Sequence, residues 1–147
     1  YFGLNYYLRI SVSLKFFVTG ITNSLLKDIS MGVGETVGWK MEPEGLYNVV
    51  KKLQEMIGKP IIVLENGVDD AKDLIRQKLI MGHLEWLHKA IVEGVNIFGY
   101  LHWSLIDNFE WHSGFEPRFG LVEIDYSNLK RTPRPSALIF GEIIMNS

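Results

Sequence analysis

Glu65 is the residue whose type and position best suit catalysis in this sequence. It directly follows the apolar run Pro60–Leu64, and such a run is typical of a β-strand that is buried on both faces. Parallel α/β folds place their ligands at the carboxyl ends of these strands, so we expect Glu65 at the mouth of a sheet. Asn66 and Gly67 then supply a tight turn. The alternative is a β-hairpin, which Asn-Gly strongly favours, but a helical pattern follows instead of a returning strand.

A second group of chemically capable side chains lies in the segment HWSLIDNFEW, residues 102–111. Asp107 and Glu110 occur there among Trp103, Phe109 and Trp111. Aromatic rings with polar edges suit a carbohydrate, because its C–H surfaces stack on the rings while its hydroxyls need hydrogen bonds. The alternative for the aromatic residues is ordinary core packing. A metal site is also conceivable, although the spacing of the two acids is not diagnostic of one.

The histidines and the remaining candidate acid favour simpler interpretations. His83 and His88 are five residues apart, so they do not share a helix face as the i, i+4 pair of a zinc motif does. We expect them to be solvated or packed. Glu44 follows Pro43 at the start of a predicted helix, which is a poor place for a catalytic acid, and we assign it no chemistry.

Strands and helices alternate along the chain, and this order would position the candidate residues. We expect a strand over residues 1–14, a long loop from Lys15 to Trp39, a helix over 42–58 and a strand over 59–67. A helix over 71–93, a strand over 95–105, an aromatic loop to Phe119, a short strand over 120–126 and a helix over 134–146 follow. The candidate inward positions of the 71–93 helix are Leu74, Leu79, Leu84, Leu87 and Ile91.

This alternation predicts an α/β fold with parallel strands joined by right-handed crossovers. Three strand–helix units are too few to close a (β/α)8 barrel, which needs about 250 residues. The pattern therefore leaves two possibilities, a small open sheet or a part of a barrel.

Composition narrows the class of protein. With 147 residues, 47% of them hydrophobic and 22% charged, the chain has the make-up of one soluble domain. A net charge of −2 makes nucleic acids and anionic membranes poor partners, and the longest apolar stretch is too short to span a bilayer. The lack of cysteine excludes disulfides and thiolate metal sites. We therefore expect a cytoplasmic protein without metal or cofactor, although the sequence begins with Tyr1 rather than Met.

Four motifs in order carry a family resemblance. They are GLNYY, GWKMEPEGLY, LENG and GYLHWSLIDNFEWHSGFEPRFGLVEIDY, and together they resemble glycoside hydrolase family 1. The segments GYLHWSL and RPSALIF are most similar to the archaeal β-glycosidases. The resemblance covers Tyr1 to Ile144, except the loop between about Ser11 and Gly38.

The resemblance implies the C-terminal part of a TIM (β/α)8 barrel, with residues 1–147 as a partial barrel domain containing its sixth to eighth units. The implied activity is that of a retaining β-glycosidase acting on β-D-glucosides or β-D-galactosides. The glutamate of the family's ENG motif is the nucleophile, and it corresponds to Glu65. The family usually has Thr before it, whereas this chain has Leu64, which we interpret as a packing variation.

The resemblance also implies roles for residues around the nucleophile. Tyr7 matches the residue that hydrogen-bonds it, and Asn5 matches a polar group near the catalytic pair. Trp103 resembles the platform beneath the sugar. Glu110 and Trp111 resemble the pair that binds the outer hydroxyls of that sugar.

Three further positions bear on the substrate. Phe119 corresponds to a residue that lines the same sugar subsite. Relatives that hydrolyse phosphorylated sugars carry Ser at the position of Glu110, and a carboxylate there would repel a phosphate, so a neutral sugar is implied. Pro117 replaces the Met that archaeal relatives often have, which leaves glucose and galactose both open.

One expected component is absent from the sequence. The family's acid/base glutamate lies in an Asn-Glu-Pro motif after the fourth strand, and this chain contains no such motif. The isolated chain is therefore expected to hydrolyse glycosides very poorly, and its expected partners are a β-linked glycoside or oligosaccharide and a complementing N-terminal barrel fragment. The alternatives are a non-catalytic carbohydrate-binding or interaction module derived from a barrel remnant, and an unrelated small α/β domain.

Overall fold

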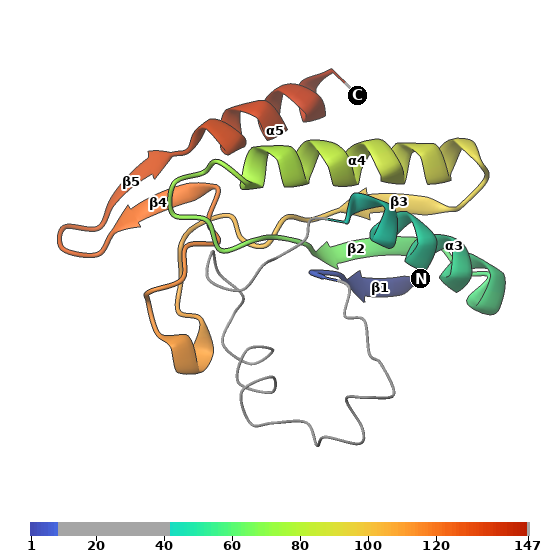
Figure 1. Ribbon diagram of the computed structural model, residues 1–147, viewed down its shortest axis with the longest axis horizontal. Coiled ribbons are helices and arrows are strands. Elements are labelled where there is room, and N and C mark those ends of the chain that lie inside the picture. The colour runs from blue at the N-terminus through green and yellow to red at the C-terminus, as the bar shows by residue number, and fades with distance from the viewer. Residues whose placement is uncertain (9–41, 147) are drawn as a thin grey trace, which may run out of the picture.

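The computed structural model describes residues 1–8 and 42–146 of the chain. Figure 1 shows the elements in these ranges, with a small sheet beside two long helices and a hairpin beside a third. Their bounds are β1 (Phe2–Asn5), α3 (Pro43–Ile57), β2 (Ile61–Glu65), α4 (Arg76–Val92), β3 (Ile97–Tyr100), η1 (Trp111–Ser113), β4 (Val122–Asp125), β5 (Lys130–Pro133) and α5 (Pro135–Met145). The predicted loop Lys15–Trp39 and residues 9–14 of the first predicted strand lie outside the described residues. Within the described residues that strand ends at Asn5, earlier than predicted.

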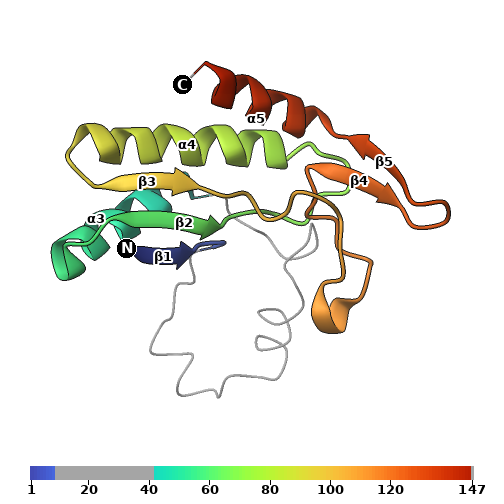
Figure 2. The same ribbon diagram turned by 180° about the vertical axis from the view of Figure 1, so that it is seen from behind.

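The main sheet has three parallel strands in the order β1-β2-β3. Each strand is followed by a segment that includes a helix, α3 after β1, α4 after β2 and α5 after β3. The predicted alternation and parallel pairing are therefore confirmed. All three strands point the same way, and the loop after β3 and the β4–β5 hairpin gather beyond their carboxyl ends (Figures 1 and 2).

The core lies between one face of this sheet and the two helices α3 and α4. Leu46 and Val50 from α3 meet Ile61 and Val63 from β2 there, and Leu87 from α4 completes the contact. We predicted that the strand before Glu65 is buried on both faces, which is wrong for the described residues. The alternation along β2 buries Ile61 and Val63, because they face the helices, while Leu64 on the same strand stays 41% exposed.

Helix α4 begins later than the sequence predicts. We expected its start at Ala71, but the helix begins at Arg76, and residues 71–75 form turns in which Asp73 has a φ of 59°. Asp70 provides the reason, because its Oδ2 accepts hydrogen bonds from the backbone N–H groups of Ile75 and Arg76 at 2.7 and 2.9 Å. A carboxylate that satisfies the free N–H groups of a first turn fixes where that turn begins.

The expected inward face of α4 is partly wrong. Leu79 and Leu87 are buried and Leu84 packs against the core, as predicted. Leu74 precedes the true helix and is exposed, and Ile91 in the last turn is also exposed.

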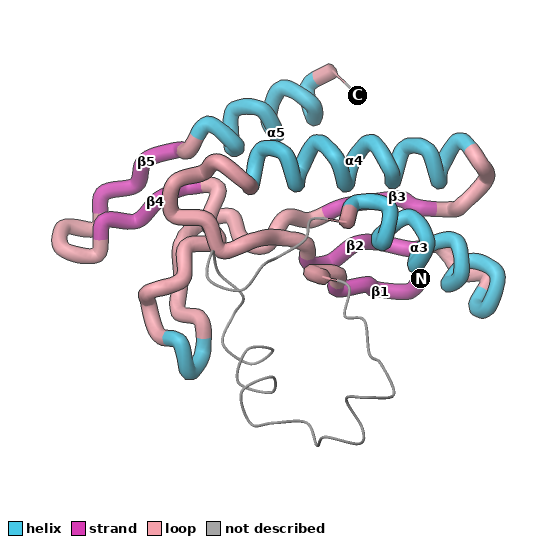
Figure 3. Tube along the Cα trace, in the orientation of Figure 1, coloured by secondary structure: helices cyan, strands magenta, loops and turns pink. Residues whose placement is uncertain are grey.

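The chain after β3 forms a long loop and then an antiparallel hairpin. Figure 3 shows that the loop contains one short helical turn, η1. The predicted short strand is confirmed as β4, but it pairs with β5, which the sequence did not predict. The predicted last helix is confirmed as α5, which begins with Pro135 in its first turn, where proline is well tolerated.

Candidate active site

Glu65 is the last residue of β2, and the strand is irregular just before it. Leu4 of β1 pairs with Val63 while the next residue, Asn5, pairs with Glu65, so Leu64 is an extra residue in the register. An extra residue of this kind bends a strand and redirects the side chain that follows, and it is common beside active sites. Gly3 leaves the space for Leu64, since a Cβ at Gly3 would overlap the Leu64 side chain. The half-buried Glu65 thus ends the strand at its open end, as predicted.

Tyr7 is the hydrogen-bond partner of this carboxylate. Its hydroxyl donates to Oε2 of Glu65 at 2.9 Å, although the two residues are 58 positions apart. Burial, and then the hydrogen bond and negative charge of Glu65, raise the pKa of the Tyr7 phenol above its ordinary value of 10.0. Tyr7 therefore stays a neutral donor. Within residues 1–8 and 42–146 the other oxygen of Glu65 accepts no hydrogen bond.

Phe119 and Asn5 are neighbours of this pair. The ring of Phe119 is buried and meets the ring of Tyr7 edge to face, with centroids 6.4 Å apart. Asn5 ends β1 and is exposed beside Glu65 in the register. The structure therefore brings four of the predicted residues together at the ends of β1 and β2.

Trp103 and Glu110 form a second pair in the loop after β3. The indole N–H of Trp103 donates to Oε1 of Glu110 at 3.1 Å. Burial raises the pKa of the Glu110 carboxyl, and the negative charges of Asp69 and Glu65 raise it further, against the opposing effect of the Trp103 N–H. The charge of Glu65 acts on Glu110, so the two carboxyl groups lie in one region of the molecule. Such an arrangement presents an acceptor and an aromatic ring to a polyhydroxylated ligand.

Trp111 is the predicted site residue that the structure does not join to the others. It begins η1 and is 79% exposed. Its indole makes no hydrogen bond and no ring contact with the other residues in the described ranges. Its neighbour Glu110 therefore connects this part of the loop to the site.

Asp107, the other acid of the aromatic loop, has a structural role. Its carboxylate is buried and accepts two hydrogen bonds from Arg134, both at 2.9 Å, and one from Arg118 at 3.3 Å. Backbone N–H groups of Gly120 and Ile124 complete its shell. Burial alone would raise the pKa of Asp107, but the Arg134 pair and the backbone donors outweigh burial and lower it. No group of three or more acidic or histidine side chains in the described residues could hold a metal ion.

Sequence reasoning missed two contacts in the segment that follows Glu65. Asn66 is completely buried, although we treated it only as part of a turn. The backbone N–H of Arg118 donates to Oδ1 of Asp69 at 2.7 Å, which ties the segment after Glu65 to the segment before Phe119. The sequence carried no signal for this second contact, because its partners are 49 residues apart.

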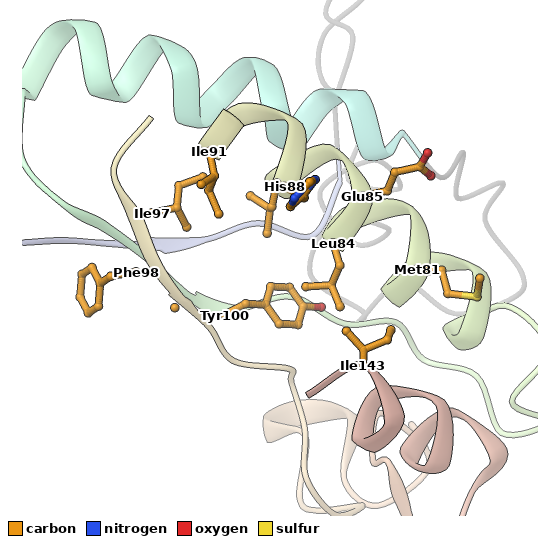
Figure 4. Close-up of a pocket in the computed structure, with 11 residues that line it drawn as sticks. Met81, Leu84, Glu85, His88, Ile91, Ile97, Phe98, Tyr100 and Ile143 are labelled. Atoms are coloured by element: carbon orange, nitrogen blue, oxygen red, sulfur yellow. The ribbon is translucent and has the colours of Figure 1, made fainter. Parts of the chain in front are cut away.

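An apolar hollow of about 710 Å³ lies elsewhere, between α4, β3 and α5. Figure 4 shows Met81, Ile91, Phe98 and Ile143 around it, with Tyr100 at one side. None of the candidate site residues lines this hollow. Glu65 and its partners therefore lie outside this cavity.

None of the helices in the described ranges has both the length and the hydropathy that a membrane crossing requires.

Comparison with known proteins gives a consistent result. The sequence model of glycosyl hydrolase family 1 matches residues 1–147. A β-galactosidase of Sulfolobus acidocaldarius is 48% identical over 106 residues, which cover 72% of this chain and 22% of the relative. The structure of the β-glycosidase of Thermosphaera aggregans is similar with a TM-score of 0.70 at 49% identity, over 72% of this chain and 22% of that one.

A β-glucosidase of Thermotoga maritima, solved with a substituted glucoimidazole, matches more of the chain. Its TM-score is 0.76 at 30% identity, over 98% of this chain and 34% of that one. These neighbours are TIM barrels, so the predicted fold class, a C-terminal part of a (β/α)8 barrel, is confirmed. The chain spans about a sixth to a third of the length of the relatives that it matches.

Proposed function

This chain belongs to glycosyl hydrolase family 1, and we propose that residues 1–147 are the part of a barrel domain that carries the nucleophile of a retaining β-glycosidase. The observation that carries the proposal is the position of Glu65. It ends a parallel strand, accepts a hydrogen bond from Tyr7 at 2.9 Å and shares a region with the Trp103–Glu110 pair. The carboxyl ends of barrel strands are where TIM-barrel enzymes bind and convert their substrates.

The proposed reaction proceeds in two steps. The Glu65 carboxylate attacks the anomeric carbon, and the bond to the leaving oxygen breaks as that oxygen takes a proton from a second carboxyl group. A water molecule then gives its proton back to the second group and displaces Glu65 from the sugar. That second group has to lie about 5–5.5 Å from Glu65 in a retaining enzyme. We propose that a complementing N-terminal part of the barrel supplies it, and that this chain alone hydrolyses glycosides very poorly.

The surrounding residues support a neutral sugar as substrate. Tyr7 orients the nucleophile, and Asn5 offers a polar group beside it. Trp103 gives the sugar a flat apolar surface. Glu110 accepts hydrogen bonds from the hydroxyls of the sugar, and its negative charge repels a phosphate. We propose β-D-glucosides and β-D-galactosides as the substrate class, because the named relatives include β-galactosidases and a β-glucosidase. Phe119 packs its ring against Tyr7.

A covalent labelling experiment tests this proposal. The chain is mixed with the N-terminal portion of the Thermosphaera aggregans β-glycosidase and treated with a 2-deoxy-2-fluoro β-glucoside that has a good leaving group. This compound is processed slowly, so the sugar should accumulate on Glu65 and add its mass to the peptide that contains Glu65. Glu65→Gln should abolish the label, whereas Glu123→Gln, at an exposed position on β4, should keep it. Labelling of another residue, or a label that survives in Glu65→Gln, would reject the assignment.

The exposure of Trp111 favours a second candidate function, a non-catalytic carbohydrate-binding module. A ring that is 79% exposed beside Glu110 can stack on a sugar without any reaction. In that case the same mixture binds the sugar, seen as a change in tryptophan fluorescence, but no peptide gains mass. The labelling experiment therefore separates the two candidates.

A further inference from the structure

Asn66 follows Glu65, and its side chain spans the end of the sheet. Its Nδ2 donates to the backbone carbonyl oxygen of Tyr6 at 2.7 Å, and its Oδ1 accepts from the hydroxyl of Tyr100 at 2.7 Å. Tyr6 comes directly after β1, and Tyr100 is the last residue of β3. A single buried carboxamide on the chain after β2 therefore connects the two outer strands of the sheet.

The backbone around Asn66 adds a third connection. The N–H of Trp103 donates to the carbonyl oxygen of Asn66 at 3.0 Å. Gly67 allows this approach, because a Cβ there would overlap the carbonyl oxygen of Trp103. The chain that leaves the candidate nucleophile thus lies directly against the residue that carries the candidate sugar platform.

We propose that Asn66 is a positioning residue, which holds Tyr7 and Trp103 in place around Glu65. This inference rests on the proposed function. Tyr6 is fixed at both of its backbone groups, since its N–H donates to the carbonyl oxygen of Glu65 at 2.9 Å and its carbonyl accepts from Asn66. Tyr7 is the next residue, so its hydroxyl meets Glu65 only while Tyr6 stays in this position.

The chemistry of the side chain explains why an amide suits this position. Asn66 is 0% exposed and needs a donor toward Tyr6 and an acceptor toward Tyr100. Aspartate would place a second acceptor against the Tyr6 carbonyl, and an apolar residue would remove both of the hydrogen bonds that the Asn66 side chain makes. Asparagine offers both functions on one short, rigid group.

Exchange of the Tyr7 hydroxyl proton with water measures this positioning directly. The full chain is labelled with ζ-¹³C tyrosine, and Tyr7→Phe identifies the Tyr7 signal in the NMR spectrum. In Asn66→Ala we expect the Tyr7 hydroxyl proton to exchange at least roughly tenfold faster, because the hydrogen bond to Glu65 opens more readily. Asn48→Ala, the same truncation on the exposed face of α3, should leave the exchange rate unchanged.

The hydroxyl of Tyr126 is an internal control for general loosening. It donates to the carbonyl oxygen of Asn108 at 3.3 Å, in the loop and hairpin region. An unchanged Tyr7 rate in Asn66→Ala, or equal acceleration at Tyr7 and Tyr126, would overturn the proposal. If Asn66→Ala does not fold, Tyr100→Phe decides, because it removes only the hydroxyl that anchors Oδ1 and should still accelerate Tyr7 selectively.

The two proposals fail in distinguishable ways. If the fluorinated sugar labels no residue while Tyr7 exchange responds to Asn66→Ala, the reaction is rejected and the positioning of Tyr7 stands. If Glu65 is labelled but the exchange rate of Tyr7 does not change, the positioning role is rejected and the reaction stands.

Discussion

Replacing Asp107 with asparagine should destabilise the chain strongly, although the two side chains have nearly the same shape. Asp107 is fully buried, and its ion pair with Arg134 has two hydrogen bonds of 2.9 Å, with Arg134 itself only 5% exposed. Asparagine keeps one acceptor but removes the negative charge, which leaves a buried guanidinium without its counter-charge. Breaking a buried pair in this way costs about 3–5 kcal/mol. We expect about 3 kcal/mol for Asp107→Asn, since part of the hydrogen bonding survives.

Urea unfolding followed by circular dichroism gives this quantity. With a slope of about 2 kcal/mol per molar urea, a loss of about 3 kcal/mol lowers the midpoint by about 1.5 M. Glu123→Gln makes the same change of charge at an exposed position on β4 and should stay within about 0.5 kcal/mol of the unmodified chain.

The pH dependence provides an independent check. The pKa of Asp107 in the folded chain is lowered, so its contribution is present above the unfolded-state value of about 3.9 and is lost as pH falls through the folded-state pKa. A protonated Asp107 resembles asparagine, so the two proteins should converge in stability at low pH. A difference below about 1 kcal/mol at pH 7 would refute the claim that this ion pair holds the loop.

Two further predictions concern His83 and Gly67. Burial lowers the pKa of His83 to about 4, so the unfolded chain takes up a proton below pH about 6.5 that the folded chain refuses, and stability falls from there down to pH about 4. Urea titrations between these pH values measure the fall in the free energy of unfolding. His83→Phe should reduce that fall by up to about 3 kcal/mol, whereas the variant His88→Phe, at an exposed position, should leave it unchanged. Equal falls in the two variants would contradict the prediction. Gly67→Ala should cost about 1–3 kcal/mol in thermal unfolding because its Cβ meets the Trp103 carbonyl. Gly141→Ala, which faces open space on α5, should instead stabilise by up to about 1 kcal/mol, and equal effects would show that crowding is not the cause.

Local signals predicted the helices α3 and α5 well, and they failed for α4. Pro43 and Pro135 mark first turns, and the left-handed Gly58 ends α3, so nearby residues fix these ends. The start of α4 depends on which of several aspartates caps it. Asp70 accepts a hydrogen bond from the backbone N–H of Arg76, and the Asp70 carbonyl oxygen accepts one from the Arg76 side chain. No local sequence pattern predicts that Asp70 is the aspartate that makes these contacts.

Strand β5 was missed for a different reason. Its residues are polar or proline and all are exposed, so the alternation that marks a half-buried strand is absent. It exists because it pairs with β4 across a short turn. The formation of such a strand depends on pairing with its neighbour more than on its own side chains.

The sequence predicted most of the residues that the structure brings together at the candidate site, but their residue types did not predict the different contacts of Asp107 and Glu110. Asp107 and Glu110 lie three residues apart in one aromatic loop. Residue type and spacing do not distinguish them, and only the family resemblance assigned a role to Glu110 and none to Asp107. Arg134 forms an ion pair with Asp107, whereas Glu110 accepts a hydrogen bond from Trp103 and lies in the same region as Glu65. Arg134 lies 27 residues from Asp107, so the fold makes the distinction.

The same reasoning explains how the chain accommodates Leu64 where its family usually has Thr. A strand presents successive side chains to opposite faces, so a shift of one residue would turn Glu65 to the other face of the sheet. Leu64 lies at the one irregular position between β1 and β2 in the described residues, and its larger side chain fits against the bare backbone of Gly3. With Leu64 in this position, the hydroxyl of Tyr7 donates to Glu65 at 2.9 Å. The precision of this site thus depends on the register of its strands, and the register tolerates Leu64 because the neighbouring strand has a glycine where the leucine projects.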